Sequence, residues 1–364
     1  MRMAFFGSSL LSAYWNGAAT YYRGLLRDLS DRGWRIAFYE PDAYERQAHR
    51  DIDPPDWAEV HVYDATAEAV LAVTAAAVDA DVVVKASGVG VFDDLLCERA
   101  LTMTAPGSLA VYWDVDAPAT LADMATSRDH PLRRSIAAFD LVLTYGGGPP
   151  VVSTYRAFGA RDCIPIYNAL DPTTHFPVPP DARFAADLAF LGNRLPDREA
   201  RVAEFFLDPA ARLPGRSFLL GGAGWGDKPV PANVRCCGHV PTADHNAFNS
   251  TPLAVLNIAR DSMAQVGYSP ATRVFEAAGA GACLITDRWA GIEEFLKPEH
   301  EILVARDGHD VERLLAELTP SRSREIGAAA RERVLADHTY ARRGAEVDAL
   351  LRDTLARKRG RRAA

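Results

Sequence analysis

Hydrophobic residues in the first half of the chain fall into short runs separated by longer segments of helical character. Several runs are continuous rather than alternating, which is typical of parallel strands covered on both faces. Segments 17–29 and 66–78 between them are helical in pattern. The order strand, helix, strand, helix predicts a doubly wound parallel sheet. We expect its strands at 3–6, 35–39, 59–63, 81–85, 109–113, 140–145 and 163–167.

The pattern breaks off between residues 168 and 180, where four prolines stand in a stretch with neither period. We interpret 169–180 as a linker, after which the alternation restarts. Strands are expected at 187–191, 217–220, 234–237, 253–258, 282–286 and 301–304. The sequence therefore predicts an α/β protein of two Rossmann-like domains, 1–168 and 181–335, followed by a terminal helix and basic tail over 336–364.

Length and charge fit this division. A chain of 364 residues exceeds what one hydrophobic core usually supports. The formal net charge of −8 argues against general nucleic-acid binding, which needs many Lys and Arg side chains. The basic tail at 357–362 is a local exception, and we expect it to be a solvated, frayed terminus.

Cysteine usage and hydropathy bear on location. The five cysteines form no C-x-x-C pair, and the first residues resemble a buried strand rather than a leader. No stretch is apolar for long enough to span a bilayer. We expect a cytoplasmic protein with reduced thiols and no transmembrane segment.

The segment after strand 253–258 carries the main chemical signal, because ligands of open α/β sheets bind beyond the carboxyl ends of strands. Ser269 is a favoured N-cap residue and Pro270 suits the first helical position. We therefore expect a helix that begins there, and its free N–H groups, including those of Ala271 and Thr272, attract phosphate.

Two charged residues of this helix extend the hypothesis. Arg273 is expected to hold a diphosphate in bidentate fashion, and Glu276 to accept hydrogen bonds from ribose hydroxyls. The alternative is a plain helix start with an Arg–Glu salt bridge on its surface, and spacing alone does not separate the two.

The same region resembles a known family. The matching residues are Arg273-x-Phe275-Glu276-Ala277, Gly281-Ala282, Leu284-x-Thr286-Asp287-Arg288, Gly291, Glu293-Glu294, Leu256-Asn257-Ile258-x-Arg260, Gly238-His239-Val240-Pro241, Ile164-Pro165 with Ala169-x-Asp171-Pro172, and Tyr112-Trp113-x-x-Asp116-x-Pro118. Together they resemble the CgeB-like (spore maturation protein-like) branch of group 1 glycosyltransferases, densely from about 164 to 304 and sparsely before.

The resemblance implies the GT-B fold and a function. A sugar would pass from a nucleoside diphosphate sugar, preferentially UDP-linked, to an acceptor hydroxyl without a metal or other cofactor. The acceptor would be a glycan, a lipid, a small molecule or a protein. Arg260 would belong to the donor site, and His239 and Val240 would frame the base through main-chain atoms. Tyr268 stands where the broader group has a glutamate that contacts the transferred sugar.

Further donor contacts are expected in two loops of the second domain. In the turn Gly192-Asn193-Arg194, the arginine would neutralise the departing diphosphate, as a metal does elsewhere; the alternative is a surface arginine. In the glycine-rich loop 221–226, Gly222 would let the backbone approach a ligand, unless the loop is merely flexible. We reject a metal site at Cys236-Cys237-Gly238-His239 with Asp244 and His245, because adjacent cysteines splay to opposite faces of a strand and no second pair supplies the spacing of a zinc site.

The acceptor side is assigned to the first domain. Ser8 ends the first strand, and Trp15, Asn16 and Gly17 open the next helix; Tyr145 is a weaker candidate. Asp114 and Asp116 follow a buried strand, where a carboxylate can take the proton of an acceptor hydroxyl. We favour Asp116, with helix capping as its alternative.

Three rival functions remain open. An NAD-dependent oxidoreductase is suggested by Glu40 at the end of the second strand, although the glycine fingerprint of dinucleotide binding is missing. A catalytically inactive nucleotide-sugar-binding protein and a nucleotide-sugar epimerase would share the fold.

Overall fold

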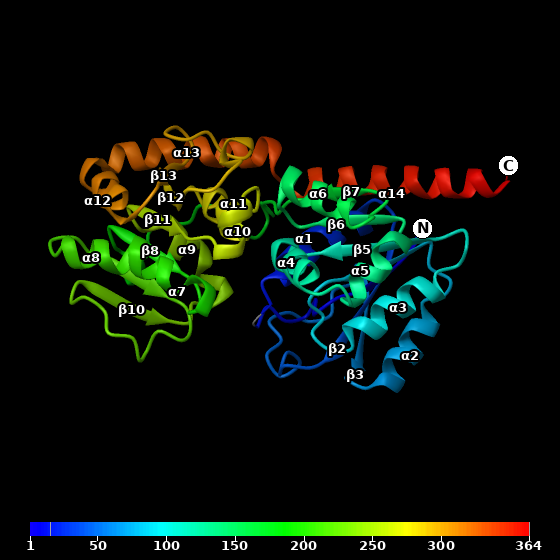
Figure 1. Cartoon of the computed structure of the whole chain (residues 1–364). Coiled ribbons are helices and arrows are strands. Elements are labelled where there is room, and N and C mark those ends of the chain that lie inside the picture. Colours follow the sequence, from blue (N-terminus) through cyan, green and yellow to red (C-terminus); the bar gives the residue numbers. More distant parts are fainter. Residues whose placement is uncertain (15, 364) are drawn as a thin grey trace. The chain divides into compact units, whose positions relative to one another are not determined.

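The computed structural model describes residues 1–14 and 16–363, with side chains as far as residue 361, and it divides into two compact units (Figure 1). The first unit contains Met1–Asn168 together with Tyr340–Ala364, and the second contains Ala169–Thr339. Within the described residues, none of the helices combines the length and the apolar character that a bilayer crossing requires.

The first unit is built on a parallel sheet of seven strands in the order β3-β2-β1-β4-β5-β6-β7. The strands are β1 (Arg2–Phe6), β2 (Arg35–Asp42), β3 (Ala58–Asp64), β4 (Val82–Ala86), β5 (Leu109–Asp114), β6 (Leu141–Thr144) and β7 (Cys163–Pro165). Its helices are α1 (Ala18–Asp31), α2 (Ala67–Ala76), α3 (Asp93–Met103), α4 (Ala117–Thr126), α5 (Pro131–Ser135), α6 (Gly148–Ala157) and α14 (Tyr340–Ala363), with the 3-10 turn η1 (Ile136–Ala138). β4 is buried along its whole length, as its continuous apolar run predicts.

The second unit repeats this design with six parallel strands in the order β10-β9-β8-β11-β12-β13. The strands are β8 (Leu188–Leu191), β9 (Phe218–Gly221), β10 (Val234–Gly238), β11 (Ala254–Asn257), β12 (Leu284–Asp287) and β13 (Leu303–Ala305). The helices are α7 (Pro196–Val202), α8 (Asp208–Arg212), α9 (His245–Ser250), α10 (Asp261–Val266), α11 (Thr272–Gly279), α12 (Gly308–Glu317) and α13 (Pro320–Asp337). Short turns complete it: η2 (Ala182–Phe184), the π-helical η3 (Ala203–Leu207), η4 (Thr242–Asp244) and η5 (Ile292–Glu294).

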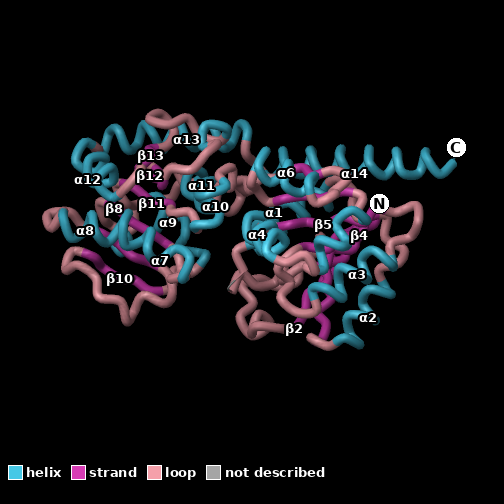
Figure 2. Tube along the Cα trace, viewed as in Figure 1, coloured by secondary structure: helices cyan, strands magenta, loops and turns pink. Residues whose placement is uncertain are grey.

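In each unit the sheet lies between helices (Figure 2). The hydrophobic core fills the space between the sheet and these helices. The largest buried side chains of the first unit include Phe5, Tyr21 and Trp113, and those of the second include Phe190 and Phe206. Both sheets are doubly wound, so the predicted fold class is confirmed.

The segment predicted as a linker belongs instead to the second unit. Leu170 forms an isolated parallel bridge with Thr339, and its N–H donates to His338 O at 2.8 Å. Its side chain also packs so closely on Gly279 that an added Cβ there would lie 2.3 Å away. The prolines therefore shape a packed segment rather than a free connection.

The basic tail is also ordered, contrary to our expectation of a frayed end. It forms the last turns of α14, which packs along α1 of the first unit. Lys358 Nζ lies 2.6 Å from Asp140, and Arg359 Nη2 lies 2.6 Å from Asp81. These acidic residues stand just before β6 and β4, so the tail is held by the amino-terminal edge of the sheet.

Candidate functional site

The strand order of the second unit places a topological switch point between β8 and β11. β9 and β10 are added to the sheet on one side of β8, whereas β12 and β13 are added on the far side of β11. The loops that follow these two strands therefore part and leave a crevice beyond their carboxyl ends, where ligands of such sheets bind.

The predicted turn Gly192-Asn193-Arg194 follows β8 and is tied to the loop after β9. Asn193 Oδ1 accepts from Ala223 N at 2.9 Å, and Arg194 N donates to Ala223 O at 2.9 Å. Gly222 has a φ of +116°, and an added Cβ there would lie 2.2 Å from Gly192 O. Packing of the two loops therefore explains Gly222, without the close ligand approach that we expected.

Arg194 requires a correction. Its guanidinium lies 2.8 Å from Glu199 and 3.0 Å from Asp227. Arg194 and Lys228 together hold the pKa of Glu199 down to about 2. Because Arg194 already neutralises two carboxylates, the structure does not offer it to a diphosphate; the alternative of a surface ion pair is the one that the structure contains.

Arg198, in α7, lies beside the same turn as Arg194. Its Nη2 donates to Asn193 O at 2.5 Å and lies against Gly192. Burial and the charge of Arg273 lower its pKa to about 10. Among the described residues, its buried Nε has no hydrogen-bond partner. Sequence reasoning missed Arg198 because it chose the arginine nearest the strand.

The helix of the phosphate hypothesis begins later than predicted. α11 starts at Thr272, with Ala271 at the N-cap and no side-chain cap. Ser269 is buried and its hydroxyl donates to Gly267 O at 3.0 Å, so neither Ser269 nor Pro270 opens the helix. Alanine is a poor N-cap, costing about 1 kcal/mol relative to serine. The first N–H groups of α11 are therefore left without a side-chain acceptor, which favours an external anion.

Arg273 stands in the first turn of α11. Burial lowers the pKa of its guanidinium, while the charge of Glu276 acts to raise it. Its buried Nη1 lacks a hydrogen-bond partner within the described chain. Arg198 and Arg273 are thus neighbouring arginines whose positive charges repel each other, and each has one buried N–H group without a hydrogen-bond partner among the described residues. An anion between them would relieve both costs.

Arg260 adds a third positive charge. It follows β11, forms an ion pair with Asp197 at 2.5 Å, and contributes to the lowered pKa of Arg198. Its predicted place in the donor site is therefore consistent with the electrostatics of Arg198.

Glu276 and His245 lie close to Arg273, and a second histidine, His175, lies close to Glu276. Glu276 is 8% exposed, and its Oε1 is 4.0 Å from His175 Nε2. His245 Nε2 is 3.2 Å from Val240 O, and burial and the charge of Arg273 lower its pKa. Neither histidine was predicted, because His175 falls in the supposed linker and His245 entered only as a rejected metal ligand.

His239 and Val240, the predicted frame for the base, behave differently from each other. His239 is exposed, whereas the side chain of Val240 is buried in a cluster that includes Phe184 and Phe248. The part of Val240 available to a ligand is its main chain, whose carbonyl is already approached by His245.

Tyr268 adopts a strained backbone beside the start of α11. Its φ is +50°, an unusual value for an aromatic residue, and it follows Gly267 at +76°. Its N–H donates to Ala290 O at 2.7 Å, and its ring leaves only 2.2 Å for a Cβ at Gly291. Such strain is found preferentially at functional sites.

In the first unit, Asp114 is completely buried, whereas Asp116 is half-buried with a buried Oδ1. Asp114 is completely buried and accepts from Ser87 Oγ at 2.7 Å, from Thr120 Oγ1 at 3.1 Å and from the hydroxyl of Tyr155. Its lone pairs are used in holding β4, α4 and α6, so it is not placed to receive an acceptor proton. Asp116 is half-buried at the N-cap of α4 but makes no capping hydrogen bond, so the capping alternative is not realised.

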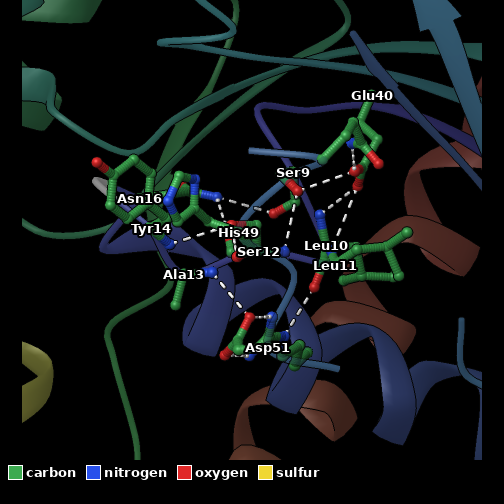
Figure 3. Close-up of polar contacts among 12 residues, drawn as sticks. Ser9, Leu10, Leu11, Ser12, Ala13, Tyr14, Asn16, Glu40, His49 and Asp51 are labelled. Atoms are coloured by element: carbon green, nitrogen blue, oxygen red, sulfur yellow. Dashed lines mark hydrogen bonds and ion pairs between the residues drawn. The ribbon is translucent and has the colours of Figure 1, made fainter. Parts of the chain in front are cut away.

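Of the predicted acceptor contacts that the structure describes, two are buried and two are at least partly exposed. Ser8 and Asn16 are buried; their side chains bond to each other at 2.9 Å, and Asn16 Nδ2 donates to the carbonyls of Ser9 and Ser12 (Figure 3). They shape the loop between β1 and α1. Gly17 is exposed with open space around it, and Tyr145 is half-buried. Trp15 lies outside the described residues.

Glu40 no longer supports a nicotinamide site. It is fully buried, and its oxygens accept from Ser9 Oγ at 2.9 Å, Gln47 Nε2 at 2.6 Å and the backbone of Leu10 at 2.5 Å (Figure 3). A ribose would have to displace these bonds. Nor do the described residues contain a group of three or more His, Cys, Asp or Glu placed to hold a metal ion.

Comparisons with known proteins agree with this fold. A family model described as "Glycosyl transferase-like" matches residues 198–349, which include Arg198, Arg273 and Glu276. No curated protein shows significant sequence similarity to the chain.

Solved structures match over nearly the whole chain. Sucrose-phosphate synthase from Thermosynechococcus elongatus has a TM-score of 0.72 at 13% identity and covers 98% of this chain and 99% of its own. Anabaena HepE (Alr3699), solved with UDP and glucose, has a TM-score of 0.67 at 13% identity, with 97% and 100% covered. A DNA-modifying β-glucosyltransferase gives 0.59 at 12% identity, with 98% and 99% covered.

These neighbours establish the fold as GT-B. The family model adds a glycosyl transferase-like match over 198–349, which lies mostly in the second unit.

Proposed function

We propose that the chain transfers a sugar from a UDP-sugar to an acceptor hydroxyl. The observation that carries the proposal is the pair Arg198 and Arg273, two neighbouring arginines with unsatisfied N–H groups beside an uncapped helix end. A diphosphate carries the charge and the oxygen acceptors that this arrangement lacks. UDP is preferred because HepE was solved with UDP and with UDP-glucose.

In this proposal the arginines act chiefly on the leaving group. Negative charge builds up on the diphosphate as the glycosidic bond breaks, and preorganised cations stabilise it in the transition state. Arg273, Arg198 and the N–H groups of α11 supply this charge without a metal ion. Glu276 accepts hydrogen bonds from the ribose hydroxyls. Asp116 takes the proton of the acceptor hydroxyl. We also place the chain in the CgeB-like branch on the motifs given above.

Titration calorimetry with UDP tests the donor site. Arg273→Ala and Arg198→Ala are each expected to weaken UDP binding at least about tenfold, the usual worth of a charge-assisted hydrogen bond. Arg212→Ala is the control, because Arg212 is an arginine of the same unit whose guanidinium is already paired with Glu312, so its loss should leave UDP binding unchanged. Absence of binding of UDP, GDP and dTDP to the wild type would contradict the proposal.

Catalysis is tested separately from binding. Asp116→Asn is expected to abolish sugar transfer while UDP binds normally, because the variant keeps the shape of the side chain but cannot accept a proton. Product analysis then separates transfer from its alternatives: an epimerase returns a changed donor sugar, and an inactive binding protein returns the donor intact, without slow hydrolysis.

A further inference from the structure

Three exposed aromatic side chains stand along one edge of the first sheet. Tyr14 lies in the loop after β1, Tyr44 in the loop after β2 and Phe92 in the loop after β4, with exposed fractions of 37%, 55% and 40%. β2, β1 and β4 are consecutive in the sheet, and neighbouring strands lie about 4.8 Å apart. The three rings therefore come from adjacent loops at the edge where ligands of such sheets bind.

Two of these rings are fixed although they face solvent. The hydroxyl of Tyr44 donates to Gly90 O at 2.6 Å, and the Arg46 guanidinium lies 5.0 Å from the ring centre. Tyr14 stacks on His49 with ring centres 4.0 Å apart and planes 10° apart (Figure 3). A ring held rigidly and still exposed loses little entropy on stacking with a ligand.

The backbone supports the same interpretation. Tyr44 and Phe92 have φ angles of +57° and +51°, in the left-handed region that aromatic residues disfavour. No turn chemistry requires an aromatic side chain there, and an asparagine or glycine would adopt this conformation more easily. Strain of this kind is found where function needs the side chain in place.

The charges of these loops indicate what kind of ligand fits. Arg23 binds both oxygens of Asp51, at 2.9 and 2.7 Å, and Arg50 donates to Gln47 at 2.8 Å. Lys85 is buried against Asp93. The basic groups of these loops are thus engaged within the protein, unlike the arginines of the donor site.

Arg46 lies at the switch point of this sheet, and among the described residues its buried Nε has no hydrogen-bond partner. It is buried, and its Nη1 donates to Ser8 O at 3.2 Å and Val89 O at 3.4 Å, so it joins the loops that leave β1 and β4. The side chain thus lies between the ends of β1 and β4. Tyr14, Tyr44 and Phe92 stand exposed on the rim of the same edge, where a ligand can reach them.

We infer that Tyr14, Tyr44 and Phe92 form an aromatic platform for the acceptor, which presents to it an uncharged ring with a flat apolar face and hydroxyl groups. The inference rests on the proposed function and names its acceptor class. Asp116 follows β5, the strand next to β4, so the candidate base stands in the loop adjoining Phe92. A hydroxyl of the stacked ring would be delivered toward that loop.

Ligand-observed NMR and calorimetry with four probes test the platform: phenyl β-glucoside, methyl β-glucoside, phenol and glucose 6-phosphate, each in the presence of UDP. Tyr44→Ala and Tyr14→Ala are expected to weaken phenyl β-glucoside binding about 3- to 10-fold, the range of one aromatic stacking contact. Tyr44→Phe should keep most of the affinity, because it retains the ring. Comparing methyl β-glucoside with phenol shows whether a sugar face or an aryl face is bound.

Leu71→Ala is the matched control, because Leu71 is exposed to a similar extent, 44%, on α2 of the same unit. It should change no probe affinity. The inference is overturned if Tyr44→Ala and Tyr14→Ala, folded by thermal melting, bind phenyl β-glucoside as the wild type does. It is also overturned if no uncharged probe binds, or if glucose 6-phosphate binds most tightly. UDP affinity, measured alongside, reports on the proposed function alone, so the two can fail separately.

Discussion

The two units share one strand order but treat their switch points in opposite ways. In the second unit, the loops after β8 and β11 surround arginines with unsatisfied N–H groups. In the first unit, Arg46 joins the loops after β1 and β4, and Glu40 binds four donors of its own chain. Arg46 also has a buried Nε without a partner among the described residues, but it stands alone and bonds to the loops on both sides, whereas the second unit brings Arg198 and Arg273 close together.

This difference shows that topology provides a crevice but not a binding site. Net affinity for a ligand comes from polar groups that folding leaves unpaired, since a satisfied group must first break its bonds. The family match covers 198–349 and therefore falls mostly on the unit with the unpaired groups. The first unit has its accessible groups on the rim.

The largest expected effect comes from the packing that shapes the second crevice. Gly222→Ala places a Cβ 2.2 Å from Gly192 O at a φ of +116°, so we expect a loss of about 3 kcal/mol in stability. Gly17→Ala, in open space in the first unit, should be close to neutral. Thermal and denaturant unfolding measure both. Equal stability of the two variants would show that the loops of the second unit are not rigid.

Removing Arg198 of the second unit and Arg46 of the first unit in turn tests the comparison directly. Arg198→Ala is expected to lower UDP affinity about 10- to 100-fold, with little loss of stability because it removes repulsion with Arg273. Arg46→Met should leave UDP affinity unchanged and lower stability by about 1–3 kcal/mol, since two carbonyls lose their donor. Calorimetry and melting distinguish them. A UDP effect of Arg46→Met would contradict the division of roles.

The pH dependence of UDP binding gives a smaller effect. The pKa of Arg198 is lowered to about 10, so in the free protein it loses its proton as pH rises through that value. The folded protein then binds fewer protons than the unfolded chain, so stability gains from this group above pH 10 while UDP affinity falls. The affinity ratio of wild type to Arg198→Ala should decline up to about tenfold per pH unit. A ratio constant to pH 11 would place the pKa of Arg198 at its ordinary value.

The smallest effect concerns the loop that carries Tyr14. Burial acts to raise the pKa of Asp51, but hydrogen bonds and charge from Arg23 and the N–H of Ala13 lower it overall. Its stabilisation is therefore present above the unfolded pKa of about 3.9 and is lost as pH falls below that value. Asp51→Asn should cost about 0.5–1 kcal/mol at pH 7, and the difference should shrink below pH 4. Melting curves at pH 7 and below pH 4 measure the stability difference between wild type and Asp51→Asn. A difference that stays the same at both pH values would contradict the prediction.

The sequence predicted the fold because the sheets depend on local patterns. Continuous apolar runs such as β4 and β11 can only be buried strands of a covered sheet, and their alternation with helices limits the topology. Helix α11 lies where the sequence predicted a helix, but it starts at Thr272 rather than at Ser269-Pro270. Ser269-Pro270 has the composition of a helix start, yet the Ser269 hydroxyl bonds to Gly267 in a turn fixed by packing against Ala290.

Side-chain partners from distant parts of the chain were beyond the sequence. Arg194 and Arg198 stand four residues apart, and Arg194 is the one that pairs with carboxylates, those of Glu199 and of Asp227 from another loop. The same holds for the basic tail, whose partners Asp81 and Asp140 precede strands more than two hundred residues earlier. Such choices depend on tertiary contacts rather than on local propensity.

The bridge between Leu170 and Thr339 has a consequence for the protein's architecture. The chain enters the second unit and leaves it at neighbouring points, because these two residues pair at its boundary. The second unit is thus an insertion with adjoining ends, and the first unit is complete once α14 has returned to it. Residues 169–339 form a cassette: recombination at two adjacent junctions would exchange the whole second unit for that of a relative, and leave the first unit with its own sheet and its own last helix.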